Sequence, residues 1–402
     1  MTRMLDALNS PEFLADPYPV YARLRAAAPV AAVMPGIWLA TGYEAADRIL
    51  RDPRFGKRFL AAIAWRYGPD AAAEPLFQMV SRFLLLMNPP DHTRLRTMAS
   101  KAFSARQAPD LRRLAQRVAN ALVDGFIHRG RADLVPAFAY PLPIRVICTL
   151  LDMSLADGAQ FQAETQAIAK AFELNPISRE EIEAGNRAAR VFNDYFREVC
   201  RERRRRPGPD LVSMLLRAEA GDQRLTEDEI VANITLLFVA GHETTANMLG
   251  NALLSLFRHP DQLALLKSRP GLMAKAVGEA LRYESSVQVA ARTALEDMDI
   301  GGGAIREGDS VYIYLGATNR DPAVYEEPDR FIIERPEATP NPLSFGGGAH
   351  YCLCARLARI ELETALETLF RRMPGLRLVD IDRPCWKSTQ TIRGLEALEA
   401  VW

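Results

Sequence analysis

Along most of this chain, hydrophobic residues recur at the three- and four-residue spacing that is typical of amphipathic helices. The pattern is clear in residues 110–126, 161–172 and 182–204, where Leu, Val, Phe and Ala stand among Arg, Gln and Glu. The same spacing predicts helices over residues 272–283 and 352–370. Each segment places its apolar side chains on one face, so we expect a mainly helical fold.

A longer helix is predicted between Thr226 and His259. Thr226 with Glu229 three residues later is typical of a capping box, and Pro260 ends the pattern. Apolar residues cover this helix on most sides, which indicates a position inside a large core. We therefore expect it at the centre of the fold.

The signals for β structure are few. Residues 30–33 and 37–40 flank a Met-Pro-Gly sequence, which predicts a hairpin. A further strand is expected over residues 311–315, between glycines. Residues 319–345 hold repeated prolines and acids, and such a long irregular stretch within a compact domain is usually functional. The predicted fold class is therefore mainly α with minor β sheets.

The amino-acid composition argues against several classes of protein. The 402 residues hold 50 Lys and Arg and 50 Asp and Glu, so the net charge is zero, which argues against bulk nucleic-acid binding. Five cysteines are too few and too scattered for a disulfide framework. Residues 1–9 carry Arg3 and Asp6 and no apolar core, so we expect no secretory signal, and no apolar run reaches the about 18 residues that would span a membrane. We expect one cytoplasmic domain over residues 1–402, with no nucleic-acid partner, no membrane span and a monomeric state.

The segment that is most informative about function is Phe345-Gly-Gly-Gly-Ala-His350-Tyr-Cys352. Glycines allow a positive φ and close approach to a bulky partner. A cysteine at the start of the predicted helix favours the thiolate, which is a strong metal ligand. A phosphate-binding loop would need a Lys-Ser/Thr ending that is missing here. A zinc site from His350, Cys352 and Cys354 would lack the usual spacing and a fourth ligand.

This pattern resembles the haem-binding loop of the cytochrome P-450 family. The resemblance implies the cytochrome P-450 fold, with the long central helix over the haem. It also implies haem b as cofactor, Cys352 as the axial ligand of its iron, and Phe345 and His350 as cofactor-binding residues. The family usually has glycine where this chain has Cys354. Residues two apart on a helix point to different sides, so we assign Cys352 alone to the metal.

The middle of the long helix reads Ala240-Gly241-His242-Glu243-Thr244-Thr245. Glycine and threonine lower helix stability, and a buried Glu is costly, so the sequence indicates function here. Without other evidence, the threonines would be expected to bond to their own helix carbonyls. The stretch resembles the family's oxygen-binding motif, which lies in a locally opened helix. The resemblance implies that Thr244 hydrogen-bonds dioxygen, that Glu243 relays protons and that Ala240 contacts the cofactor.

Four cations match family positions that bind the haem propionates: His92 and Arg96, one helical turn apart, together with Arg292 and His350. Taken singly, each would be interpreted as an ordinary surface cation.

Glu279 and Arg282 resemble the family's Glu-x-x-Arg motif, which implies a structural cluster with Arg330 of the Pro-Asp-Arg-Phe segment.

The resemblance implies a monooxygenase that inserts one atom of dioxygen into a C–H or C=C bond of a hydrophobic small molecule, in natural-product or lipid metabolism. No fused reductase fits in this length, so electrons would come from a separate ferredoxin or flavodoxin and its NAD(P)H reductase. Arg94, Arg106 and Arg356 are the expected docking residues. A substrate tethered to a carrier protein stays open as an alternative to a free one.

Some assignments stay open at this point. Trp65, Phe77 and Phe83 fit either a substrate chamber or a plain core. The alternatives for the whole protein are a peroxide-driven peroxygenase and a non-catalytic haem sensor.

Overall fold

The computed structural model describes residue 8 and residues 10–104, 108–220 and 223–402. The chain forms two compact units. The first comprises Met1–Gly56, Ala115–Leu142 and Thr244–Trp402, and the second comprises Lys57–Leu114 and Pro143–Glu243. Compactness does not test whether a segment folds independently, so the single domain over residues 1–402 stays a prediction.

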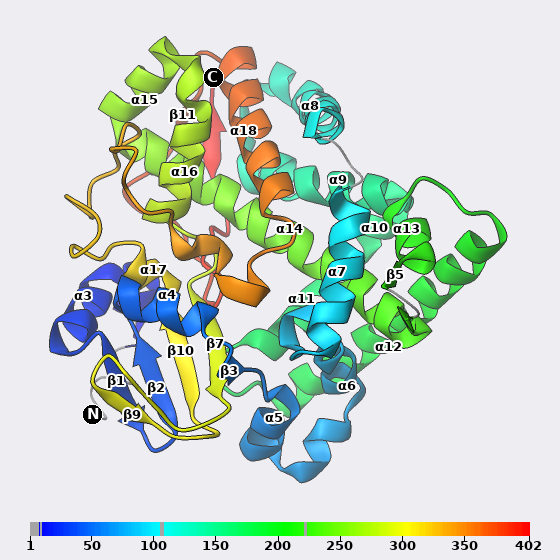
Figure 1. Cartoon of the computed structure of the whole chain (residues 1–402). Helices are drawn as coiled ribbons and strands as arrows, with labels where there is room; N and C mark the ends of the chain where they lie inside the picture. The colour runs from blue at the N-terminus through cyan, green and yellow to red at the C-terminus, as the bar shows by residue number, and fades with distance from the viewer. Residues whose placement is uncertain (1–7, 9, 105–107, 221–222) are drawn as a thin grey trace. The chain divides into compact units, whose positions relative to one another are not determined.

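Helices α8 (Ala108–Asp124), α9 (Pro141–Leu151) and α14 (Glu227–Arg258) contribute residues to both units. The other helices of the first unit are α2 (Pro11–Ala15), α3 (Tyr18–Ala27), α4 (Tyr43–Arg51), α15 (Pro260–Ser268), α16 (Met273–Tyr283), α17 (Leu315–Thr318) and α18 (Ala355–Arg372). In Figure 1, α16 and α18 lie side by side.

The C-terminal half of α14 packs with α16 and α18 in one hydrophobic core. Leu253 of α14, Ala276 of α16 and Leu366 of α18 have no exposed surface. Burying large aliphatic side chains contributes roughly 1.5–3 kcal/mol each, so this core holds the helices that carry the functional residues described below.

A five-stranded sheet lies in the first unit, with its blue and yellow strands side by side in Figure 1. Its strands are β1 (Val30–Met34), β2 (Ile37–Ala40), β3 (Phe55–Gly56), β7 (Val289–Ala294) and β10 (Ser310–Tyr314), in the order β1-β2-β10-β7-β3. β1 and β2 pair antiparallel, with Val30 opposite Ala40, so the predicted hairpin is confirmed. β10 runs parallel to β2 and antiparallel to β7.

The remaining strands form small sheets. β4 (Arg131–Asp133), β11 (Arg377–Leu378) and β12 (Glu399–Val401) make a three-stranded sheet, and β8 (Met298–Ile300) pairs with β9 (Gly303–Ile305). In the second unit, β5 (Glu219–Ala220) pairs with β6 (Gln223–Arg224). The predicted mainly helical class with minor sheets is confirmed.

The second unit also holds α5 (Phe59–Tyr67), α6 (Pro75–Ser81), α7 (Asp91–Ser104), α10 (Leu155–Gln160), α11 (Gln162–Ala169), α12 (Arg179–Arg205) and α13 (Leu211–Arg217). Its core contains an aromatic cluster in which Phe192 lies 5.0 Å from Phe161 and 5.9 Å from Phe238, between ring centroids. This cluster holds the N-terminal half of α14 against α12.

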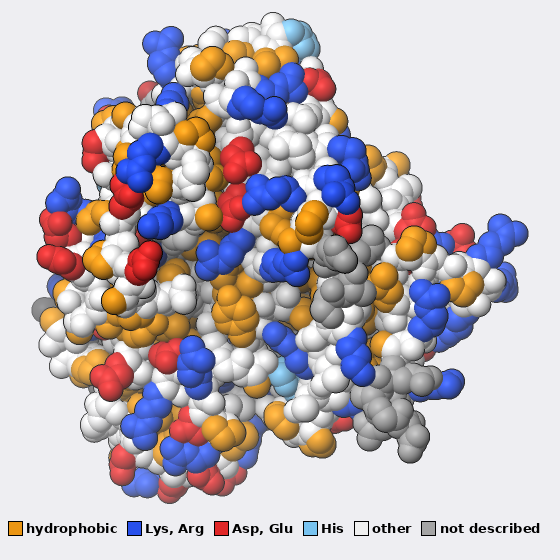
Figure 2. Space-filling view, turned by 45° about the horizontal axis from the view of Figure 1, so that its top comes forward, with side chains coloured by type: hydrophobic (Ala, Val, Ile, Leu, Met, Phe, Trp, Pro, Cys, Tyr) orange, Lys and Arg blue, Asp and Glu red, His pale blue; other side chains and the backbone are white. Residues whose placement is uncertain are grey.

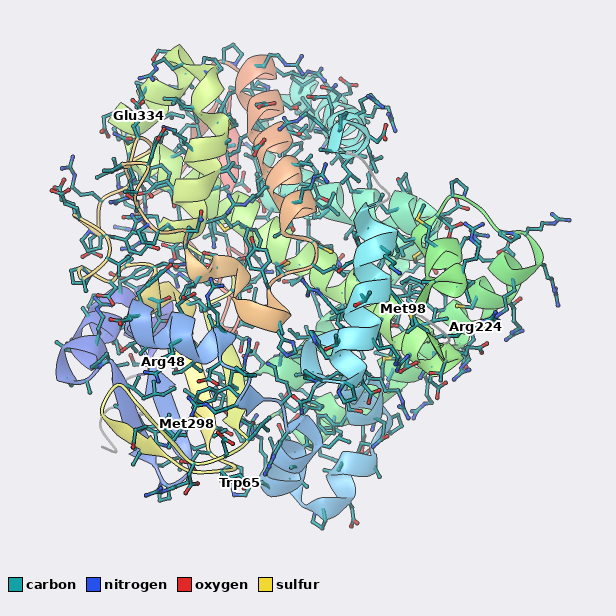
Figure 3. The ribbon with its side chains drawn as sticks, in the orientation of Figure 1. Arg48, Trp65, Met98, Arg224, Met298 and Glu334 are labelled. Atoms are coloured by element: carbon teal, nitrogen blue, oxygen red, sulfur yellow. The ribbon has the colours of Figure 1, made fainter. Side chains whose placement is uncertain are left out.

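Trp65, Phe77 and Phe83, which fit either a substrate chamber or a plain core, differ in how deeply they are buried. Phe77 and Phe83 are fully buried. Trp65, near the end of α5, is 72% exposed (Figure 3), so the core interpretation is wrong for this residue.

The local sequence signals match the structure closely. The predicted capping box is present, because Glu229 N–H bonds to Thr226 Oγ1 and Thr226 N–H bonds to Glu229 Oε2. Residues 319–342, all described, contain neither helix nor strand. The strand expected over residues 311–315 covers Ser310–Tyr314 instead, since Leu315 begins the short helix α17.

Cationic and anionic side chains both occur on the face drawn in Figure 2. Among the helices within the described residues, none combines the length and the apolar character needed to cross a membrane.

Candidate functional site

The cysteine loop of the first unit runs from Leu343 to Cys354. It begins with a 3-10 turn, continues through Gly346 with φ of 70° and Gly348 with φ of 62°, and reaches Cys352 before α18 starts. Cys352 N–H donates to the Phe345 carbonyl at 2.9 Å, which closes the loop on itself. Both Cys352 and Cys354 are partly exposed.

The predicted helix over residues 352–370 begins later than expected. Its first residue is Ala355, and Cys354 is the residue that caps it. Cys352 therefore belongs to the turn that enters the helix. The reason lies in Gly346 and Gly348, whose φ is positive, and in the bond between Cys352 and Phe345, which together keep the chain out of α-helical geometry until residue 354.

Gly348 fixes where the loop lies. A Cβ atom at this position would meet the Leu50 carbonyl oxygen at 2.4 Å and Arg51 Cα at 2.8 Å. Both contacts are shorter than side chains accept, and both partners are backbone atoms that cannot turn away. The loop therefore packs directly on the C-terminal end of α4, and only glycine fits there.

A second anchor holds the beginning of the loop. Leu343 N–H donates to Asn319 Oδ1 at 2.8 Å, and Asn319 Nδ2 donates to Ser344 Oγ at 2.8 Å. Ser344 Oγ then donates to the Leu281 carbonyl of α16 at 2.6 Å. These buried hydrogen bonds tie the cysteine loop to α16.

Arg292 of β7 is a buried cation without an acidic partner among the described residues. Its side chain donates to the neighbouring Ala291 carbonyl at 3.0 Å, and the residue is only 4% exposed. Burial lowers the pKa of Arg292 to about 10. A buried cation is costly unless an anion joins it, so this position fits a ligand that carries a carboxylate, as a haem propionate does.

His350 and Phe345 lie in the same loop and are partly exposed. The Phe345 ring lies 6.2 Å from the Tyr351 ring, between centroids, and 5.2 Å from the Arg359 guanidinium. The structure thus places His350, Phe345, Cys352 and Arg292 in the first unit.

One face of α14 is accessible although the rest of the helix is buried. Ala240 is exposed, and Leu236, Glu243 and Thr244 are partly exposed, whereas their neighbours on the other faces are mostly buried. Leu236, Glu243 and Thr244 each lie three or four positions from Ala240, so the four residues form one stripe along the helix. The structure brings Ala240, Glu243 and Thr244 onto a common face, as the site prediction requires.

Two expectations for this stretch were wrong. Glu243 is not fully buried, so the cost of burying its charge does not arise in full. α14 is also helical without interruption from Glu227 to Arg258, whereas the resemblance implies a local opening. His242, on the buried side, bonds through Nδ1 to the Phe238 carbonyl at 2.7 Å and so belongs to the packing of the helix.

His92 and Arg96 share one face of α7 in the second unit. His92 is 2% exposed and Arg96 is partly exposed. The start of this helix is fixed by Asn88, which exchanges hydrogen bonds of 2.7 Å with the Lys57 backbone and accepts the His92 N–H at 2.9 Å through its carbonyl. The chain therefore places both predicted residues in fixed positions.

Within the described residues, no three or more His, Cys, Asp or Glu side chains gather in the arrangement of a metal site. The zinc alternative built on His350, Cys352 and Cys354 therefore has no ligand set there. A single thiolate that binds the iron of a cofactor needs no such cluster.

Comparison with known proteins identifies the family. The model of the family Cytochrome P450 matches residues 70–268 and 264–374 of the chain. The chain belongs to the cytochrome P450 family. The resemblance predicted from the cysteine loop is confirmed, and the protein is an oxidoreductase, a P450 monooxygenase with a haem-thiolate iron centre implied by its family.

The relatives of this P450 match nearly its whole length. A relative from Xylella fastidiosa, named as a cytochrome P450, is 43% identical over 394 residues, covering 98% of each protein. The biotin biosynthesis cytochrome P450 of Bacillus subtilis is 39% identical over 396 residues, covering 97% of this chain and 96% of the relative. The solved structure of P450BioI with hexadec-9Z-enoic acid ligated acyl carrier protein matches with a TM-score of 0.90 and 37% identity, covering 98% of this chain and all of that chain.

The P450's Glu-x-x-Arg pair is buried and saturated with contacts. Arg282 donates to both Glu279 oxygens, at 2.8 and 2.7 Å, and to the carbonyls of Asn319, Pro328 and Arg330 at 2.8 to 2.9 Å. Each side chain is less than 5% exposed. This cluster ties the irregular stretch to α16.

The assignment of Arg330 to this cluster was wrong. Arg335 takes that place and donates from Nε to both Glu279 oxygens, at 3.1 and 3.0 Å. The Arg330 side chain is 63% exposed and pairs with Glu327, while only its carbonyl reaches the cluster. The turn that follows Pro328 sends the Arg330 side chain to solvent, and the chain returns to Glu279 at residue 335.

Among the docking residues expected for an electron carrier, Arg94 is paired with Glu229 and Asp91 and is 16% exposed, so it presents little free charge. Arg356 is exposed on α18. Arg106 lies outside the described residues.

Arg335, Asn319 and Ser344 were not predicted from the sequence. Asn319 and Ser344 stand in no motif, and their role exists only once the irregular stretch lies against α16. For Arg335 a weak signal was present, namely a second arginine a few residues after the Pro-Asp-Arg-Phe segment.

Proposed function

We propose that this P450 monooxygenase inserts one oxygen atom of dioxygen into a C–H bond or a C=C bond of a hydrophobic small molecule, in natural-product or lipid biosynthesis. The observation that carries the proposal is the accessible stripe of α14, which presents Ala240, Glu243 and Thr244 together. The biotin biosynthesis relative supports a biosynthetic role.

The proposed cofactor is haem b, with Cys352 as its thiolate ligand. Arg292, His350, His92 and Arg96 would neutralise its propionates, and Ala240 and Phe345 would contact the ring. The haem supplies the redox chemistry that activates dioxygen. The fit rests on Arg292, whose buried charge lacks a carboxylate within the described chain.

In this proposal Glu243 and Thr244 move protons. Both lie on the accessible face of α14 and are partly exposed, so the Glu243 carboxylate can exchange protons with water and the Thr244 hydroxyl can donate a hydrogen bond to dioxygen. Electrons would come from a separate ferredoxin or flavodoxin and its NAD(P)H reductase.

Replacing either thiol tests the cofactor assignment. We expect Cys352→Ala to abolish the thiolate-type spectrum of the reduced carbon monoxide complex, because the iron loses its sulfur ligand. Cys354→Gly is the matched control and should keep the spectrum. The opposite pattern would transfer the ligand role to Cys354.

Thr244→Ala tests the oxygen chemistry. Positioned proton transfer commonly contributes a factor of about 10² to 10⁴, so we expect product formed per NAD(P)H to fall by about tenfold or more while hydrogen peroxide release rises. Haem content should stay unchanged. Undiminished coupling would remove the role proposed for Thr244.

A panel of lipophilic ligands, scored by displacement of the water on the iron, would define the substrate class. Because the P450BioI structure holds an acyl chain on acyl carrier protein, the panel should compare a free fatty acid with the same chain on a carrier protein. Turnover with hydrogen peroxide that needs no reductase would favour a peroxygenase, and binding without any product would favour a haem sensor.

A further inference from the structure

An ion pair joins α7 to the first turn of α14 within the second unit. Both Nη atoms of Arg94 bond to the Glu229 carboxylate, and the contact from Nη1 to Oε2 measures 3.3 Å. The two side chains are only 16% and 13% exposed. Arg94 Nη1 also donates to the Arg224 carbonyl at 3.4 Å. Arg94 was expected to dock an electron carrier, but these partners hold its side chain within the protein.

The first turns of α14 are also held by contacts that do not involve α7. Glu229 Oε2 accepts the Thr226 N–H at 2.8 Å and the Thr226 hydroxyl at 3.0 Å, which belongs to the capping box. One turn later, Asn233 Nδ2 donates to the Arg82 carbonyl at 3.0 Å, and Asn233 Oδ1 accepts the Leu84 N–H at 2.8 Å. The carboxylate that receives Arg94 is therefore fixed in place by its own helix.

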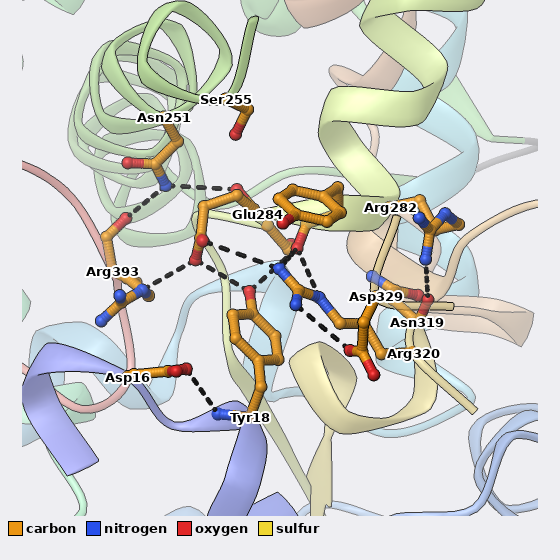
Figure 4. Close-up of polar contacts among 12 residues, drawn as sticks. Asp16, Tyr18, Asn251, Ser255, Arg282, Glu284, Asn319, Arg320, Asp329 and Arg393 are labelled. Atoms are coloured by element: carbon orange, nitrogen blue, oxygen red, sulfur yellow. Dashed lines mark hydrogen bonds and ion pairs between the residues drawn. The ribbon is translucent and has the colours of Figure 1, made fainter. Parts of the chain in front are cut away.

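The other half of α14 is held by a second asparagine, in the first unit. Asn251 Nδ2 donates to the carbonyls of Arg393 and Glu284, at 3.1 and 3.2 Å (Figure 4). Asn251 has no exposed surface. Buried polar groups with fixed partners make the surrounding structure rigid, so α14 is a fixed support for the helix that pairs with it.

Arg94 and Arg96 lie on opposite flanks of the buried stripe of α7. This stripe consists of Leu95, Met98, Ala99 and Ala102. Arg96 follows Arg94 by two residues, a rotation of about 200°, and the stripe lies within that arc, with His92 beside Arg96. Apolar packing is non-directional, whereas an arginine that bonds to a carboxylate through two nitrogens has a defined geometry. The ion pair on one flank therefore fixes the direction in which the other flank faces.

We propose that Arg94 and Glu229 are positioning residues for the cofactor. Their ion pair sets the rotation of α7 about its axis and thereby aims His92 and Arg96 at the haem propionates. The inference rests on the proposed function, because it needs His92 and Arg96 to bind the propionates.

Glu229→Gln in the haem-loaded protein tests the inference. Glutamine also completes a capping box, so α14 keeps its start while the ion pair is lost. Residues that orient a metal-binding side chain commonly contribute about ten- to a hundredfold to affinity, and we expect haem to pass to apomyoglobin about tenfold faster. The propionate bending bands of the resonance Raman spectrum should also shift, because the hydrogen-bond donors have turned. A loss of stability alone would leave these bands unchanged in the folded protein.

Arg94→Gln is the second variant, and it separates orientation from charge. If Arg94 acted on the propionates only through its charge, Arg94→Gln would accelerate haem transfer, whereas Glu229→Gln would free that charge and slow the transfer. We expect both variants to accelerate it, and the double variant to be no faster than either, because all three remove the same interaction. Slower transfer from Glu229→Gln would overturn the inference.

Asp228→Asn is the matched control. Asp228 lies in the same first turn of α14, but it pairs with Arg197 of α12, so its loss should change neither the rate of haem transfer nor the propionate bands.

Arg96→Gln is the reference for a direct contact and should shift the propionate bands. If Arg96→Gln shifts these bands and Glu229→Gln does not, the inference is wrong. If Arg96→Gln leaves them unchanged, the proposed role of Arg96 in binding haem is wrong, and the inference that rests on it is overturned as well.

Discussion

Two arginines of the first unit are both buried and differ in their hydrogen-bond and ion-pair partners. Arg282 is 2% exposed and donates to both oxygens of Glu279 and to three backbone carbonyls. Arg292 is 4% exposed and donates to one carbonyl, that of its own neighbour. The first charge is compensated by the fold, and the second is not compensated by any described residue.

The difference separates a structural role from a binding role. A buried ion cluster with all its partners holds segments together, and removal of one partner is costly. A buried cation without an acid lowers the stability of the ligand-free fold, and an anionic ligand relieves that cost. We therefore expect Arg282 to stabilise the protein in every state and Arg292 to stabilise only the protein that holds its cofactor.

The largest effect is expected from Arg282→Ala. Breaking a buried ion pair costs about 3–5 kcal/mol, and three carbonyls each lose one hydrogen bond, so the free energy of unfolding should fall by about that amount. Chemical denaturation of the ligand-free protein measures it. Arg330→Ala is the control, because its pair with Glu327 is exposed and such pairs contribute about 0–1 kcal/mol. Equal losses of unfolding free energy in the two variants would show that the buried cluster stabilises the fold no more than the exposed pair does.

Arg292→Gln should not destabilise the haem-free protein, but it should weaken the binding of haem. Without haem, the variant should unfold at the same or a higher denaturant concentration, because a buried charge has been removed. Its affinity for haem should fall by about ten- to a hundredfold, since a hydrogen bond to a charged group contributes about 1.5–3 kcal/mol. Haem transfer to apomyoglobin measures the affinity. If the variant instead lost stability without haem and kept its haem affinity, Arg292 would have a structural role and not a binding role.

The smallest effect concerns pH. Burial holds the folded-state pKa of Arg292 at about 10, below its usual value, so above about pH 10 the folded chain binds fewer protons than the unfolded chain. The unfavourable contribution of Arg292 is therefore complete below pH 10 and decreases as the pH rises. The difference in unfolding free energy between the ligand-free protein and Arg292→Gln should shrink by about 1 kcal/mol from pH 8 to pH 11.

The haem-loaded pair provides the control for this measurement. A propionate beside Arg292 favours the charged form and returns its pKa toward the usual value. The two haem-loaded proteins should therefore keep a constant difference over the same pH range. A shrinking difference in the haem-loaded proteins would indicate that no carboxylate lies beside Arg292.

Much of the fold could be predicted because its signals are local. The hairpin between Val30 and Ala40, the capping box at Thr226 and the course of α14 each follow from residues a few positions apart. The cysteine loop was recognisable for the same reason, since its glycines, His350 and Cys352 keep a fixed spacing.

The tertiary structure alone decided which charged side chains form ion pairs. Glu279 pairs with Arg335, 56 residues away, and not with Arg330, because the path of an irregular stretch depends on the helices it packs against and not on its own sequence pattern. The same holds for the isolation of Arg292 and the accessible face of Ala240. Hydrogen bonds within a turn or helix are set by neighbouring residues, whereas burial and long-range ion pairs exist only after the elements have packed.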